Sequence, residues 1–216
     1  MAKAAAIFNM ATQIDIVNLA LSALGSGATI KSINPPDGTA EAKQAAKWLP
    51  IALQRLIEEH DWSFLTTTEE PAQYEGDYTE TNGYKYAFAV PADFVRMIAV
   101  YRKGDIGKNQ DFQVGTIAGD EALAIYTDVE FPVVKYVKYS DSAVTFPGYF
   151  VEPLVLLLAS YLVGPIKRSD TNSQAVQGFL NQYRMALQRA RQIDVGTNIQ
   201  KSRPKLIPSH LRARKV

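Results

Sequence analysis

One long segment constrains the fold of this 216-residue chain more than any other. It runs from Thr39 to Leu65 and reads TAEAKQAAKWLPIALQRLIEEHDWSFL. Apolar residues recur at helical spacing and form one face, made of Ala42, Ala45, Ala46, Leu49, Leu53, Leu56 and Ile57. Thr39 is suited to cap the first turn, where the helix dipole favours the negative charge of Glu41. The segment therefore predicts a long helix, kinked at Pro50, that needs a partner for its apolar face.

Three further segments show helical periodicity. They are residues 12–24, residues 149–163 and a final helix that follows Ser169-Asp170-Thr171. Because glycine tolerates the left-handed conformation that ends helices, we expect Gly164-Pro165 to end the second and Gly196 to end the third. The apolar run Leu154–Val163 is much shorter than the roughly 20 residues of a membrane span, so it predicts a buried helix.

The middle of the chain has β character. The expected strands are residues 63–68, 84–90, 94–102, 112–117, 122–126 and 133–139, with turns at Gly104 and Gly107. Apolar helices on both sides of this region must meet to bury their faces. The sequence predicts an α+β fold, with an antiparallel β subdomain inserted into a helical bundle. The expected parts are 1–62 (helices), 63–146 (β), 147–194 (helices) and 195–216 (an extended basic tail).

Composition limits the chemistry that the chain can perform. There is no cysteine, which excludes disulfides, zinc–thiolate sites and cysteine nucleophiles. Only two histidines are present, His60 and His210, so a histidine metal site or a Ser-His-Asp triad is hard to build. We therefore expect no enzyme activity, no metal and no cofactor. The short apolar start of the chain does not fit a secretory signal, and we expect residues 1–10 to form a flexible arm.

Acidic residues near the end of the long helix allow one enzymatic alternative. Glu58 and Glu59 with Asp61 are candidates for glycoside cleavage, which needs two carboxyl groups roughly 5–10 Å apart across a cleft. Adjacent glutamates at a helix end point in different directions, so a solvated helix end is the favoured interpretation. For the following residues we expect a structural plug, in which Trp62 and Phe64 pack between bundle and sheet and His60 bonds locally.

The C-terminal tail is the strongest candidate for a functional site. Residues 195–216 hold six basic and no acidic residues, which leaves a net charge of −5 on the rest of the chain. The candidate docking residues combine cations with apolar side chains: Lys201, Arg203, Lys205, Leu206, Ile207, Leu211, Arg212 and Arg214. Besides a solvated tail, two alternatives remain open: docking into a partner's groove, or non-specific contact with nucleic-acid phosphates. No aromatic residue interleaves with the cations, so base stacking is not expected.

An acidic loop over residues 69–83 is the second candidate. It is long for a hairpin connection, and such loops are either functional or flexible. If it is functional, Tyr74, Tyr78 and the adjacent Tyr84 would be natural side chains for contacting another protein.

Several segments follow one another in a defined order along the chain. A first helix, Ile14–Leu21, closes on Ala23-Leu24-Gly25 and is followed by the long helix with its exit His60-Asp61-Trp62-Ser63-Phe64. A strand then ends at Val90-Pro91-Ala92-Asp93-Phe94 and leads into Val95-Arg96-Met97-Ile98. This order resembles the tail tubular protein A family of tailed phages. The resemblance covers about the first half of the chain in detail, and the second half matches in layout only.

The resemblance implies a structural virion protein rather than an enzyme. Members of the family are head-to-tail adaptors, or gatekeepers, that form a ring, usually of twelve subunits, under the phage portal. It implies that the tail reaches into the portal, that the β loop contacts the next tail or nozzle protein, and that the ring lines the channel for double-stranded DNA. The protein would be made in the host bacterial cytoplasm and reside at the head–tail junction of the virion. The alternatives are a peptidoglycan-hydrolysing virion protein and a non-specific DNA-binding module.

Overall fold

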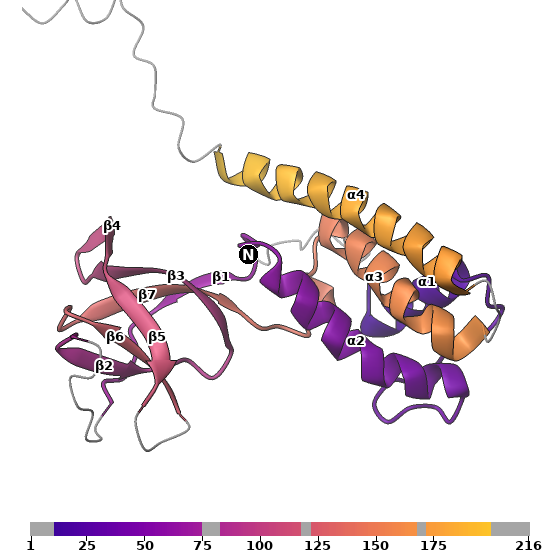
Figure 1. Ribbon diagram of the computed structural model, residues 1–216, viewed down its shortest axis with the longest axis horizontal. Helices are drawn as coiled ribbons and strands as arrows, with labels where there is room; N and C mark the ends of the chain where they lie inside the picture. Colours follow the sequence, from indigo (N-terminus) through magenta and orange to yellow (C-terminus); the bar gives the residue numbers. More distant parts are fainter. Residues whose placement is uncertain (1–10, 75–82, 118–121, 168–171, 200–216) are drawn as a thin grey trace, which may run out of the picture.

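Helices from both ends of the chain form one part of the molecule, and the central residues form another (Figure 1). The computed structural model describes residues 11–74, 83–117, 122–167 and 172–199. The helices are α1 (Gln13–Ala23), α2 (Ala40–Glu58), α3 (Gly148–Lys167) and α4 (Asn172–Ile199). The β strands lie between α2 and α3 in the sequence and pair in antiparallel fashion. The predicted α+β fold, a helical bundle with an inserted antiparallel β region, is confirmed.

Side-chain caps fix the starts of the first two helices. Thr12 and Asp15 form a capping box, in which the Thr12 hydroxyl accepts from the Asp15 amide at 3.2 Å and the Asp15 carboxylate accepts from the Thr12 amide at 2.8 Å. At α2, the Thr39 hydroxyl accepts from the Ala42 amide at 3.2 Å, as the sequence predicts. The Thr39 hydroxyl also donates to Asp37, and this bond, with backbone amide donors, lowers the pKa of Asp37 to about 2.

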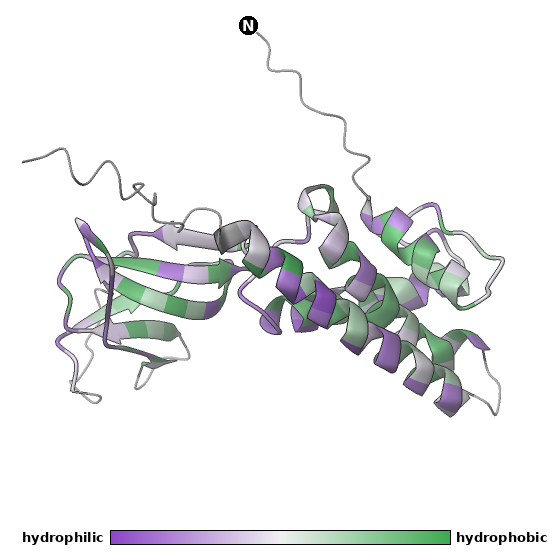
Figure 2. Ribbon diagram, turned by 90° about the horizontal axis from the view of Figure 1, so that it is seen from above, coloured by the Kyte–Doolittle hydropathy of each residue, from purple (hydrophilic) through white to green (hydrophobic). Residues whose placement is uncertain are grey.

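Helix α3 lies at the centre of the bundle and packs against each of the other three helices. Its buried residues belong to the same apolar cluster as the buried residues of α1 and α2, and Figure 2 shows apolar and polar residues alternating along the helices. By length and composition alone, α3 is the one helix in the described ranges that could cross a membrane, and half of it is buried inside the protein. This packing fits the predicted buried helix, since the core helix of a globular protein has the same composition.

Two glycines expected to end helices do not end them. Helix α3 continues through Gly164 and Pro165 to Lys167, and α4 continues through Gly196 to Ile199. Glycine permits the left-handed conformation but does not impose it, and inside a helix it costs only about 1 kcal/mol relative to alanine. The Thr197 hydroxyl also donates to the Ile193 carbonyl at 3.0 Å within this last part of α4. Residues 195–199 are therefore helical rather than the start of an extended tail.

The β region consists of two antiparallel sheets. Strands β1 (Thr66–Glu69), β7 (Pro132–Lys138), β3 (Phe94–Arg102) and β4 (Asp105–Gln110) form one sheet in that order. Strands β2 (Tyr86–Ala89), β6 (Leu123–Thr127) and β5 (Phe112–Thr116) form the other. A buried cluster takes side chains from both sheets: Phe88, Val100, Ile125, Val134 and Tyr136.

Most of the predicted strands occur within a few residues of their expected positions, with two differences. Gly107 belongs to β4 rather than to a turn, and its φ of 133° is a conformation that glycine adopts readily. Residues 63–65 form a turn in which the Leu65 amide donates to the Trp62 carbonyl at 3.0 Å, so β1 begins only at Thr66.

Trp62 closes the end of the bundle next to the sheets. Its side chain is fully buried, and its indole N–H donates to the Leu56 carbonyl at 2.8 Å, one of the carbonyls that the end of α2 leaves without a helical partner. Phe150 of α3 meets its ring edge-on, with centroids 5.0 Å apart. Val137 of β7 belongs to the same buried cluster as Trp62 and the helices. The predicted packing of Trp62 between bundle and sheet is confirmed.

A Trp62→Phe substitution tests this role. We expect it to lower the free energy of unfolding by about 1–3 kcal/mol, because the buried Leu56 carbonyl loses its donor. The matched control is Trp48→Phe on α2, where the half-buried ring lies 5.3 Å from Tyr161, and it should cost less than about 1 kcal/mol. Urea unfolding followed by circular dichroism measures both. Equal losses would contradict the role assigned to Trp62.

Candidate functional site

A buried carboxylate joins three segments at the boundary between the helical and β parts. Asp194, near the end of α4, is 1% exposed. Its carboxylate accepts hydrogen bonds from the Ser63 hydroxyl at 2.6 Å, the Ser63 amide at 3.1 and 3.2 Å, and the Tyr149 hydroxyl at 2.9 Å. His60 Nε2 lies 3.1 Å from the same group. These four residues, the Asp194 cluster, fix α4 to the start of α3 and to the segment that follows α2.

The partner of His60 differs from expectation. Its side-chain polar contact is with Asp194, 134 positions away in the sequence, while its ring meets the neighbouring Trp62 edge-on with centroids 4.9 Å apart. Local reasoning missed this because the acceptor comes from a helix at the other end of the chain. Asp194 breaks the apolar pattern of α4, and that polar residue is the one sequence signal that points to a buried hydrogen-bonded group.

The Asp194 cluster has the residue types of a hydrolytic triad but a different order. In a triad, the imidazole lies between the hydroxyl and the carboxylate, so that it can take the hydroxyl proton. Here the carboxylate lies between the two, and the Ser63 hydroxyl donates to Asp194. The arrangement satisfies a buried charge with several donors, which is the chemistry of a structural tie.

A second contact reinforces the end of α4. The guanidinium of Arg191 donates to the Glu59 side chain at 2.7 Å and to the Glu59 backbone carbonyl, at the C-terminal cap of α2. Both side chains are about one-third exposed, so the ion pair itself adds modestly to stability. Together with the Asp194 cluster it fixes two successive turns of α4 just before the basic segment begins.

The carboxylates considered for glycoside cleavage are held by separate partners. Glu58 accepts from Gln54 at 2.9 Å, Glu59 pairs with Arg191, and Asp61 pairs with Arg96 of β3. Each partner lies on a different element, so the three carboxylates are drawn in different directions. This arrangement supports their interpretation as residues of a helix end and of the contact with β3.

The predicted docking residues of the tail lie outside the described residues. They are Lys201, Arg203, Lys205, Leu206, Ile207, Leu211, Arg212 and Arg214. The structure places the point from which they continue, the C-terminal end of α4 at Ile199. That end follows the turns held by Asp194 and Arg191, so the tail is attached to a fixed part of the protein.

Two of the three candidate tyrosines pack against the β region. Tyr74 and Tyr84 are partly buried against a cluster of Ala87, Ile117, Ala124 and Tyr126. The Tyr74 amide donates to the Ala87 carbonyl at 3.0 Å, so this end of the acidic loop runs beside β2. Tyr78 lies outside the described residues. A contact between this loop and another protein stays a prediction.

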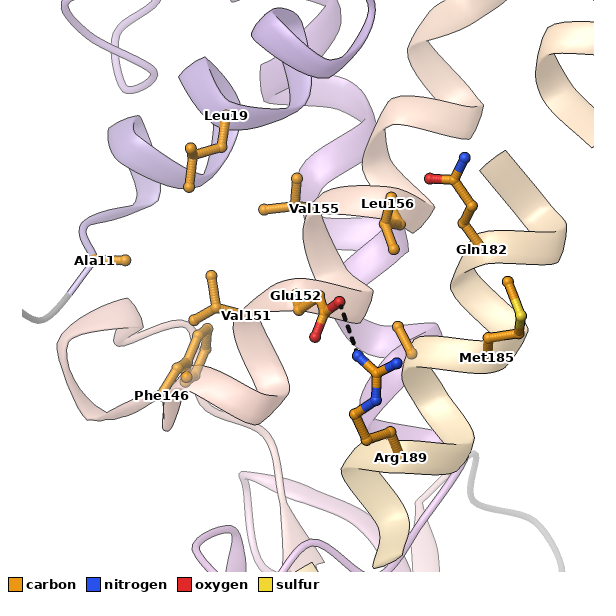
Figure 3. A pocket seen from close by; sticks show the side chains of 12 residues that line it. Ala11, Leu19, Phe146, Val151, Glu152, Val155, Leu156, Gln182, Met185 and Arg189 are labelled. Atoms are coloured by element: carbon orange, nitrogen blue, oxygen red, sulfur yellow. Dashed lines mark ion pairs between the residues drawn. The ribbon is translucent and has the colours of Figure 1, made fainter. Parts of the chain in front are cut away.

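A groove between helices is a surface that the sequence reading missed. It has a volume of about 650 Å³ and is lined by residues of α1, α3, α4 and the segment before α1 (Figure 3). Leu19 of α1 is 51% exposed and Met185 of α4 is 61% exposed, and both lie on its walls. Glu152 and Arg189 form an ion pair of 3.6 Å at the groove. Leu19 and Met185 lie outside the buried faces of their helices, and such exposed apolar residues are the sequence signal that could have indicated the groove.

Neither the described residues nor comparisons with known proteins indicate a metal site or a family for this chain. Among the described residues, no group of three or more histidine, aspartate or glutamate side chains could hold a metal ion. A scan against protein-family models finds no match, and a search of curated proteins finds no significant similarity.

Replacing Asp194 by alanine tests the structural tie. The Ser63 and Tyr149 donors would lose their shared acceptor, and we expect the free energy of unfolding to fall by about 3–5 kcal/mol. Asp141→Ala at an exposed position is the matched control and should change it by less than about 0.5 kcal/mol. Urea unfolding gives both values, and a loss for Asp194→Ala as small as the control's would refute the tie.

Alkaline pH tests the same cluster through Tyr149. Burial, and then the hydrogen bond to Asp194, raise the pKa of Tyr149 from 10.0 to about 12. Between pH 10 and 12 the unfolded state therefore loses this proton while the folded state keeps it, so stability falls as pH rises through that window. Tyr149→Phe should make the fall less steep, although Tyr183 and Tyr136, whose pKa values are also raised by burial, still contribute. The measurement is urea unfolding from pH 9 to 11, and an unchanged slope would contradict the assignment.

Proposed function

We propose that this chain is a head-to-tail adaptor of a tailed phage, a structural virion protein that forms a ring, a dodecamer by resemblance, between the portal and the tail. The ring would line the channel through which packaged double-stranded DNA passes. One observation carries the proposal beyond the resemblance. The end of α4 is held by the buried Asp194 cluster, and the basic segment with its apolar side chains continues from that end.

A fixed attachment point favours docking by the tail. Binding costs conformational entropy, and less remains to be lost when the segment starts from a rigid element. The cations of residues 200–216 suit an acidic surface, while Leu206, Ile207 and Leu211 offer apolar side chains to a groove. In a ring, repeated tails act together, so a modest affinity per subunit gives a stable assembly.

The β region would face the next component of the tail. The acidic loop around Tyr74, Tyr78 and Tyr84 is the proposed contact with the downstream tail or nozzle protein. Two of these tyrosines are partly buried in the β region, so the contact would use their exposed edges together with the rest of the loop. In this role the protein works at the head–tail junction of the virion, after synthesis in the host bacterial cytoplasm, and needs no cofactor or small-molecule substrate.

Removal of residues 201–216 tests the proposal. The truncated chain keeps every contact of the Asp194 cluster, so its melting temperature should match that of the full chain. We expect the full chain to co-sediment as a ring with the portal encoded by the same genome and the truncated chain to remain unbound. Two triple variants separate the apolar contribution of the tail from the charged one. In the first, serine replaces Leu206, Ile207 and Leu211, and in the second, glutamine replaces Arg212, Arg214 and Lys215.

Several outcomes would contradict the proposal. Equal portal binding by the truncated and full chains would show that the tail is not the docking element. No complex with the portal at any ratio would contradict the adaptor function. Lysis of cell-wall material that is lost on Glu58→Ala or Glu59→Ala would instead support the hydrolase. DNA binding that falls steeply with salt and is lost with the tail, without portal binding, would support the nucleic-acid alternative.

A further inference from the structure

The groove between α1, α3 and α4 is open to solvent on one side of the helical bundle. Its walls carry the side chains of Leu19, Val155 and Met185, which come from the three different helices (Figure 3). Large apolar side chains that are more than half exposed on facing walls are costly to leave in water. A volume of about 650 Å³ accommodates several side chains of an additional segment.

The chain itself enters the helical bundle at one wall of this groove. Ala11, the first described residue, lines the groove and is packed against the helical core. The capping box at Thr12 and Asp15 fixes the backbone at the next residue. Residues 1–10 therefore join the folded protein at the edge of the open apolar surface.

The sequence of these ten residues suits an apolar site. They read MAKAAAIFNM, with Lys3 and Asn9 as the only residues that are not apolar. Phe8 stands three positions before Ala11, so an extended chain carries its Cα about 10 Å from that of Ala11. Ile7 and Phe8 are then within reach of the groove, and the small alanines before them can follow its surface.

We propose that residues 1–10 fold back into the groove of their own chain, with Ile7 and Phe8 packed among Leu19, Val155 and Met185. The covalent connection at Ala11 gives the segment an effective concentration in the millimolar range, so it outcompetes the same segment of a second copy in dilute solution. This inference stands apart from the proposed adaptor function, because it concerns the isolated chain.

Because the chain contains no cysteine, introduced cysteines can test this proposal in the full chain without competing thiols. The variant Phe8→Cys with Met185→Cys is oxidised in dilute solution and analysed by non-reducing electrophoresis and mass spectrometry. We expect a disulfide within one chain. The control pairs Phe8→Cys with Ile106→Cys on β4, where the side chain is 69% exposed, and should give little of that product. Disulfides between chains would assign the groove to a second copy, and no disulfide, or equal yields from both pairs, would overturn the proposal.

A second pair of variants tests the groove surface itself. Leu19→Glu, added to the Phe8 and Met185 cysteine variant, should lower the rate of disulfide formation by about tenfold or more, because docking would bury a charge. Ile51→Glu on α2 is the matched control, since Ile51 is also 51% exposed and does not line the groove. Equal rates for the two glutamate variants would show that apolar packing does not hold the segment there.

Discussion

The contact on which the arrangement of this protein most depends is the buried carboxylate of Asp194. It lies near the C-terminal end of α4, where the helix dipole disfavours negative charge, and it is almost fully removed from water. Both costs are offset only while the donors from Ser63 and Tyr149 remain in place, with His60 alongside. Because those donors come from segments far apart in the sequence, one side chain joins the two helical halves of the chain where the β region begins.

This tie gives the proposed function a physical basis. Residues 200–216 carry the concentrated positive charge of a chain whose remainder is acidic, and they continue from the C-terminal end of α4, which the Asp194 cluster holds. A fixed starting point favours docking of a ring protein through its tail. A mobile starting point would lose more conformational entropy when each copy binds, and this loss would weaken binding. The groove between α1, α3 and α4 is a separate feature, and its apolar lining matches the N-terminal segment rather than the basic tail.

The sequence predicted features that depend on local periodicity and capping. It did not predict features that depend on contacts between residues far apart in the chain. The α2 face and the cap at Thr39 were predicted correctly, because each follows from residues within one or two turns. The predicted ends of α3 and α4 were wrong, because glycine permits the left-handed conformation without imposing it and costs only about 1 kcal/mol inside a helix. The contact of His60 with Asp194 spans most of the chain, and the groove arises only when three helices pack together.

The most direct measurement is an electron cryo-microscopy reconstruction of the portal mixed with the full-length chain. We predict a closed ring of this protein beneath the portal, with residues 200–216 of each copy lying on the portal surface and α4 still joined to Ser63 through Asp194. A ring attached through the β region, with the basic segments directed away from the portal, would contradict docking by the tail, and a portal that carries no ring would contradict the adaptor function.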